Sequence, residues 1–293
     1  MQFDKTTIAV RERGMLDTLD LSLHVLREYA GPLAAAMLLG ILPLMAVNYV
    51  LLGWMAGGID EESGLPWRFM YHLSLQIYLQ VPLAGIFATA YLGQAVFLEE
   101  PRLGEVIRDV LRLLPRIAWC HLVIRGAAVG WLLLLMVERH GAFDGVLEGF
   151  LLPCLVGYAS VVRAFRPFIN EIVLLERNPL TSQGERVTTV GRRSRMLHGA
   201  NVGEWLARWI GSCLLGVLLT LSVYGTMYFF ASVAWEDWSQ GPLLIRYLMP
   251  LAMWMVAGFF TVFRFLTYLD ARIRQEGWEV ELRLRAEAAR MAR

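Results

Sequence analysis

The chain has 293 residues and a net charge of +1; 57% of its residues are hydrophobic and only 18% are charged. Its mean hydropathy is +0.49, whereas about a quarter of the residues of a soluble domain are charged. The composition therefore excludes an ordinary soluble domain and indicates a membrane protein, for which we expect no nucleic-acid partner.

Six apolar runs are long enough to cross a bilayer, which needs about 20 helical residues. The third run is interrupted only by Arg125 and the sixth only by Arg264, and the fourth has the shortest uncharged stretch. The first run is too long for a signal-peptide core and lacks a persuasive cleavage site, so we expect a retained span. We predict an all-α, polytopic membrane protein with spans at about 33–56, 70–98, 117–137, 146–166, 209–234 and 247–269.

Basic residues are unevenly distributed between the segments that flank these spans. Twenty lysines and arginines lie before the first span or after the second, fourth and sixth spans, against three in the remaining loops. Basic segments stay preferentially on the cytoplasmic side. The bias predicts a bacterial-type cytoplasmic membrane protein with both termini cytoplasmic and with the acidic loops "GGIDEESG" and "AWEDWSQG" on the opposite side.

Stretches with apolar residues at helical spacing precede the first, third and, more weakly, the fifth span. The returning second and fourth spans also end alike, in "QAVFLEEP" and "EIVLLERNP". This predicts three repeats of one interfacial amphipathic helix and a two-span hairpin, although amphipathic flanks are common in helical membrane proteins generally. The apolar positions are Leu16, Leu19, Leu23 and Leu26 before the first span, and Leu103, Val106, Val110 and Leu113 before the third.

Three regions follow from this pattern. Residues 1–32 form a cytoplasmic N-terminal segment with an amphipathic helix, and residues 33–270 form the six-helix transmembrane domain. Residues 271–293 are predicted to form a cytoplasmic helix, because they contain strong helix formers and favourable pairs of opposite charge four residues apart.

Two arginines, Arg163 and Arg166, lie near the end of the fourth span, roughly 22 and 27 Å along the helix from Glu148. Helical spacing places Arg163, Arg166 and Asn170 on one face, and Arg264 has a similar depth in the sixth span. One interpretation is helix-end anchoring, with side chains that extend to lipid phosphates or water. The other is a shared basic pocket for an anionic lipid headgroup or a phosphate-bearing ligand, because guanidinium groups bind phosphate bidentately.

Arg125 lies deeper, about 13 Å into the third span. A charge at this depth should face the bundle and find a carboxylate, a backbone carbonyl or water. Candidate partners at the ends of the returning spans are Gln94, Glu171 and Asp270. Arg125 is the leading functional candidate of the sequence, and a buried structural charge pair is an equal alternative.

Catalytic and metal-binding patterns are missing from the sequence. It contains no HExxH, GxSxG, Walker or GxGxxG motif, and its five histidines share no ligand spacing. Cys120, Cys154 and Cys213 each lie in an apolar run without a partner cluster. We therefore expect no enzymatic activity, disulfide, zinc site or other cofactor.

The hairpin repeats, the stretch "FINEIVLLERNP" and above all the closing stretch "FRFLTYLDARIRQEGWEVEL" resemble bacterial six-span proteins related to the membrane domain of glycerophosphoryl diester phosphodiesterases. In that family the phosphodiesterase activity belongs to a separate barrel domain, for which this sequence has no room. The resemblance implies a membrane module and transfers no catalytic residue to this chain.

We expect a non-enzymatic membrane protein that binds an anionic lipid or assembles with other membrane proteins. The alternative is a transporter or permease subunit, which predicts a water-filled cavity open to one side around Arg125, whereas a scaffold predicts a closed bundle. The candidate site residues are Arg125, Arg163, Arg166, Glu171, Arg264 and Asp270.

Overall fold

A computed structural model describes residues 14–57, 65–96, 101–139, 141–181, 188–198, 202–238 and 244–276. Over these ranges the chain forms helices joined by short connections, without a β-strand. Five of its helices are long and apolar enough to cross a membrane, and a bent pair of helices provides a sixth crossing if it counts as one span. The predicted all-α, polytopic architecture is confirmed.

The spans are built from more helices than the hydropathy pattern distinguishes. Four of them contain a short 3₁₀ or π-helical segment. The spans are α2 (Ala30–Leu52) with η2 (Gly53–Gly57); α3 (Trp67–Ala84) with α4 (Ile86–Ala95); α5 (Leu103–Ala118), η3 (Trp119–Ile124) and α6 (Ala127–Met136); η4 (Leu147–Leu151) with α7 (Leu152–Phe165); α10 (Val202–Trp235); and η5 (Leu244–Leu248) with α11 (Met249–Glu276).

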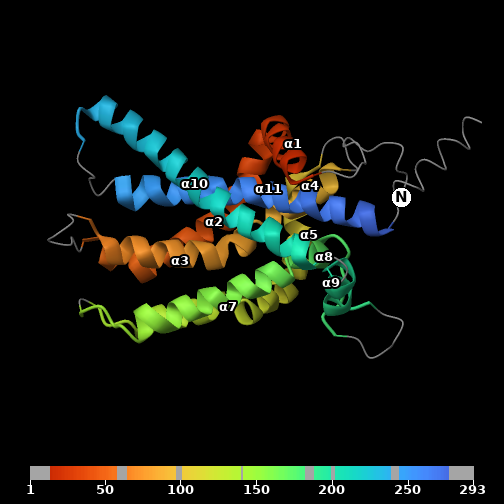
Figure 1. Ribbon diagram of the computed structural model, residues 1–293, viewed down its shortest axis with the longest axis horizontal. Helices are drawn as coiled ribbons and strands as arrows, with labels where there is room; N and C mark the ends of the chain where they lie inside the picture. The colour runs from red at the N-terminus through yellow and green to blue at the C-terminus, as the bar shows by residue number, and fades with distance from the viewer. Residues whose placement is uncertain are drawn as a thin grey trace, which may run out of the picture.

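Figure 1 shows α3, α7 and α11 running along the long axis of the molecule, with α5, α8 (Ile169–Leu174) and α9 (Val190–His198) gathered toward one end. The end of α11 lies at this same end, which we call the α9 end. α11 continues without a break past residue 270, the predicted end of the transmembrane domain, to Glu276. The rest of the predicted C-terminal helix, 277–293, lies outside the described residues.

Amphipathic helices lie at the three positions that the repeat pattern predicts: α1 (Met15–Glu28) and α9 precede pairs of long helices, and α5 is also the first part of the bent third span. In α5, Val106 and Val110 are fully buried. In α1 the residues that pack inward against α11 are Thr18, Ser22 and Val25, while Leu16 and Leu23 are exposed. Small side chains allow the close contact with α11, and the leucines point outward, where an interfacial helix meets lipid.

Three spans are interrupted or end at a proline or glycine: the second at Gly85, the third at Gly126 and the fourth before Pro167. Gly85 separates α3 from α4, three residues after Pro82, and α7 ends at Phe165, just before Pro167. At the first break α2 approaches so closely that a Cβ added to Gly40 would lie 2.1 Å from the carbonyl oxygen of Ala84. Proline lacks the N–H of a regular helix and glycine allows close backbone contact, so these residues explain both features.

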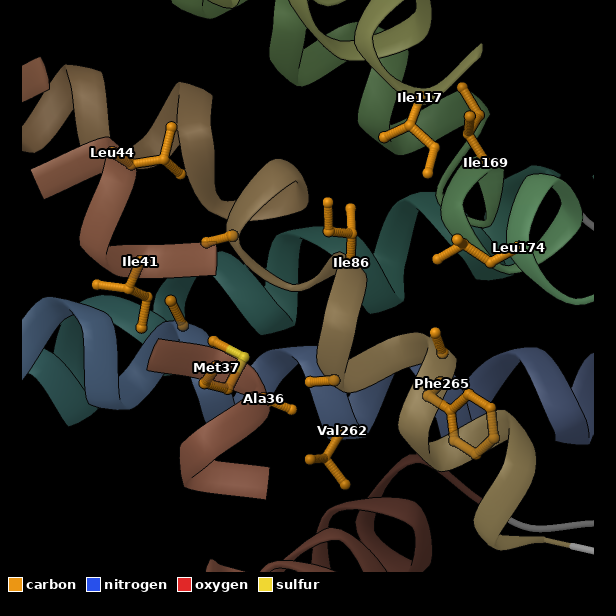
Figure 2. Close-up of a cluster of buried hydrophobic side chains, with 14 of the residues drawn as sticks. Ala36, Met37, Ile41, Leu44, Ile86, Ile117, Ile169, Leu174, Val262 and Phe265 are labelled. Carbon is orange, nitrogen blue, oxygen red and sulfur yellow. The ribbon is translucent and has the colours of Figure 1, made fainter. Parts of the chain in front are cut away.

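The apolar core surrounds these breaks. Figure 2 shows Met37 and Ile41 of α2 together with Ile86 of α4 and Val262 and Phe265 of α11. All five side chains are buried. The core thus holds the broken second span between the first and the last spans.

Candidate functional site: an intramembrane cavity with three arginines

A cavity of about 570 Å³ lies between α3, α7, α10 and α11. Its lining is mostly apolar, but Arg125, Arg163 and Arg264 contribute to its wall. Arg163 is in the last turn of α7, near the α9 end. The lining extends along α11 as far as Met249, about 22 Å of helix away from Arg264. The cavity therefore has an arginine end and a long apolar arm.

Arg163 is held by the break in α3. Its Nη2 donates hydrogen bonds to the carbonyl oxygens of Tyr78 and Leu79, the latter at 3.1 Å, and its guanidinium lies 4.1 Å from the centre of the Tyr78 ring. In a regular helix the N–H of residue 82 would bond to the Tyr78 carbonyl. Because residue 82 is Pro82, that carbonyl has no helical donor, and the arginine supplies one.

Arg125 is held by the break between α7 and α8. It is 2% exposed, and its Nη2 donates a 2.8 Å hydrogen bond to the carbonyl oxygen of Arg166, the C-cap of α7. A cation is favourable at the C-terminus of a helix, where carbonyl oxygens lack helical donors. The next residue, Gly126, has a φ of 76°, which glycine adopts easily, and the chain bends there by 54° into α6.

Arg264 is the member of the three that pairs with a carboxylate. Its Nε lies 2.8 Å from Oε1 of Glu171, and its Nη2 lies 3.3 Å from Oγ1 of Thr89. Glu171 belongs to α8 and is fully buried. Glu171, one of the candidate partners of Arg125, thus forms its ion pair with Arg264.

The charges of this cluster do not balance among the described residues. Within that part of the chain, no carboxylate lies at ion-pair distance from Arg125 or Arg163, and the Nε of each is buried without a hydrogen-bond partner. Arg208, which also lines the cavity, differs, because its Nη2 lies 2.7 Å from the carboxylate of Glu204. Burying a charge without a neutralising partner costs roughly several kcal/mol of free energy. A bound anion would offset this cost, so the cluster favours the binding of an anion.

Arg166 does not belong to the basic cluster, contrary to the predicted shared face of Arg163, Arg166 and Asn170. Its side chain is exposed and only its carbonyl contacts Arg125. The helix ends before Pro167, so the spacing of three and four residues no longer places the side chains together. Asn170 is buried instead, where it donates to the Pro82 carbonyl at 2.6 Å and accepts a hydrogen bond from His121.

Asp270 also lies in a different network. Its carboxylate is 3.1 Å from Arg274 and 3.7 Å from Arg208. In the described part of the chain, neither Asp270, Gln94 nor Glu171 forms an ion pair or hydrogen bond with Arg125. The partner of Arg125 is a backbone carbonyl, which was one of the three kinds of partner expected.

A second buried polar cluster was not predicted. Near the start of α3, Arg68 donates from Nε and Nη2 to the two carboxylate oxygens of Glu148, both at 2.7 Å. His72 Nε2 lies 3.1 Å from the same carboxylate, and both His72 and Glu148 are fully buried. The sequence signal was one basic and one acidic residue flanking neighbouring hairpins. The cluster joins α3 to η4 and neutralises its own charge.

Comparison of the chain with protein-family models, curated protein sequences and solved structures finds no match. Among the described residues, no group of three or more His, Cys, Asp and Glu side chains is arranged to hold a metal ion. The arginines that line the cavity supply positive charge and guanidinium N–H donors.

Proposed function

We propose that this chain is a non-enzymatic, multi-pass protein of a bacterial-type cytoplasmic membrane, with cytoplasmic termini, that binds an anionic, phosphate-type group in the cavity. The observation that carries the proposal is the arrangement of three arginines, Arg125, Arg163 and Arg264, that have among the described residues one paired carboxylate, that of Glu171. The resemblance to the membrane domains of glycerophosphoryl diester phosphodiesterases supports a module without its own catalytic residues.

The donor inventory supports an anion rather than a neutral ligand. Arg125 and Arg163 each use Nη2 for backbone carbonyls, and a guanidinium carries five N–H donors. Guanidinium groups bind phosphate and carboxylate in bidentate geometry. The cavity volume also falls in the range of roughly 300–1,000 Å³ that is typical of ligand sites.

The charge distribution supports the orientation. The basic segments flank the same ends of the spans as α9 and the end of α11, which predicts that the α9 end is cytoplasmic. The arginine end of the cavity then lies toward the leaflet in which anionic headgroups produce a negative surface potential.

Native mass spectrometry of protein released gently from its own membrane tests the proposal. Wild type should retain a phosphate-bearing molecule, and Arg125→Gln, Arg163→Gln and Arg264→Gln should each lose it. Arg166→Gln is the matched control, because its side chain is exposed and outside the cavity. Retention of the ligand in all three cavity variants, or no ligand in wild type, contradicts the proposal. Another membrane protein that copurifies regardless of these arginines favours the assembly role.

A transporter or permease subunit is the second candidate, because the structure contains a cavity that Arg125 lines. A transport role predicts that reconstituted vesicles move the retained molecule across the bilayer and that Arg125→Gln stops this movement. A binding role predicts retention without movement.

A further inference from the structure

We infer that the ligand is an anionic lipid whose hydrocarbon chain lies in the apolar arm of the cavity, and that it reaches the arginines sideways from the bilayer. This inference rests on the proposed anion site and adds the class of ligand and its route. It follows from the composition of the arm, the position of its opening and the charge at its end.

The arm beyond the arginines suits a hydrocarbon chain. Its wall includes Ile77 of α3, Met249, Met253 and Val256 of α11, and Leu221 of α10. A free phosphate ion would occupy only the arginine end and leave this volume empty. Apolar cavities hold water poorly because water there finds too few hydrogen-bond partners, whereas a hydrocarbon chain gains dispersion contacts along the whole arm.

The opening of the cavity faces the region where lipid is expected. Val217 and Leu221 line the cavity, yet they are 60% and 62% exposed, so they form its rim. They lie near the middle of the 34-residue helix α10, whose most apolar segment is wholly unburied within the protein. The middle of a membrane-spanning helix lies in the hydrocarbon layer of the bilayer.

The position of the rim selects the route. A hydrated anion would have to lose its water to pass an apolar rim that lies in hydrocarbon. This dehydration costs free energy, as it does for any charge in the interior of a membrane. A lipid moves along α10 without removing its chain from apolar surroundings, and its headgroup ends beside Arg163 and Arg264. Figure 1 shows that α10 and α11 diverge toward the end opposite α9.

The test uses the full-length protein in nanodiscs of phosphatidylglycerol and phosphatidylcholine with a phosphatidylglycerol that carries a diazirine in its acyl chain. After illumination, adducts are mapped by mass spectrometry. We expect adducts on the cavity-lining residues Met253 and Val256, and also on Leu214, which is 64% exposed and outside the cavity. Labelling of Leu214 reports ordinary contact with the bilayer and serves as the internal control.

Two substitutions on α10 separate the arm from the outer surface. Thr220→Trp fills the arm, because Thr220 lines it, whereas Leu218→Trp is the matched control at an exposed position that does not. We expect Thr220→Trp and Arg163→Gln to reduce labelling of Met253 and Val256 by roughly tenfold or more. For Arg163→Gln, this is the effect on binding of losing a hydrogen bond to a charged group. Leu218→Trp should leave this labelling unchanged, and Leu214 should be labelled in every variant.

A separate measurement with inorganic phosphate tests the anion site alone. If phosphate raises the Tm of wild type and Thr220→Trp but not of Arg163→Gln, while Met253 and Val256 are never labelled, the lipid inference is wrong and the anion site stands. If the two residues are labelled equally in wild type, Thr220→Trp and Arg163→Gln, the inference is also wrong. If Arg163→Gln changes neither the effect of phosphate on the Tm nor the labelling by lipid, the proposed function fails as well.

Discussion

Nε of Arg264 lies 2.8 Å from Oε1 of Glu171, and this contact joins α11 to α8 at the arginine end of the cavity. The carboxylate of Glu171 is fully buried, and the side chain of Arg264 is 16% exposed. The two opposite charges therefore neutralise each other within the protein, and each side chain depends on the other for this neutralisation.

Removal of one partner should be costly. Glu171→Gln leaves Arg264 without its carboxylate and raises the excess of positive charge, so we expect the free energy of unfolding to fall by about 3–5 kcal/mol, as for other broken buried pairs. Denaturant titration in detergent measures this change. The double variant Glu171→Gln/Arg264→Gln removes both charges and should be more stable than Glu171→Gln alone. A single variant as stable as wild type would contradict the pairing.

The contact between Arg163 and the Tyr78 carbonyl should depend on Pro82. Pro82→Ala restores the N–H that bonds to this carbonyl in a regular helix, and the arginine then becomes less necessary. In a double-mutant cycle, Arg163→Gln should cost about 0.5–1.5 kcal/mol less stability in the Pro82→Ala background than in wild type. Additive effects of the two substitutions would show that Arg163 does not serve the orphaned carbonyl.

The crossing of α2 over the break at Gly85 requires glycine at position 40. A Cβ there would lie 2.1 Å from the Ala84 carbonyl oxygen, and backbone atoms cannot move aside easily. Gly40→Ala should lower stability by about 1–3 kcal/mol, the usual cost of overpacking. Gly31 is the matched control in the same helix, since nothing lies within 4 Å of its added Cβ. Gly31→Ala should leave stability unchanged or raise it by up to about 1 kcal/mol.

His198 should make stability depend on pH. Burial lowers its pKa below 6.5, the nearby charge of Arg166 lowers it further, and the hydrogen bond to the Ser194 carbonyl offsets part of this. Because the folded pKa is below the unfolded value of about 6.5, the unfolded state binds more protons between the two values. The free energy of unfolding should therefore be constant above about pH 6.5 and fall as the pH is lowered toward the folded pKa.

Thermal unfolding between pH 5 and pH 8 measures this dependence. His198→Gln should reduce the loss of stability that begins below about pH 6.5. His24→Gln is the control, because the side chain of His24 is 72% exposed, and this variant should keep the wild-type profile. Identical profiles for His198→Gln and wild type would show that another group causes the dependence.

The basic cluster was only partly predictable. The depth of Arg125, Arg163 and Arg264 follows from their positions in the apolar runs, and the structure places all three on one cavity. An unbroken helix predicts Arg166 on the same face as Arg163, but the helix ends before Pro167, which disfavours helical geometry in the residue before it. The sequence does not predict which carbonyl binds Arg125, because Arg166 is 41 positions away and the contact depends on the packing of two different helices.

By itself, the sequence determined the helical class, the six apolar runs and the amphipathic helices before each hairpin, because the hydrocarbon thickness sets the length of a span and helical periodicity sets its faces. Only the tertiary structure decided which charges share a cavity, which carbonyls they satisfy and where the cavity opens. These features depend on breaks at Pro82, Gly85 and Pro167 and on contacts between distant helices. Side-chain periodicity contains no information about such contacts, since it describes each helix separately.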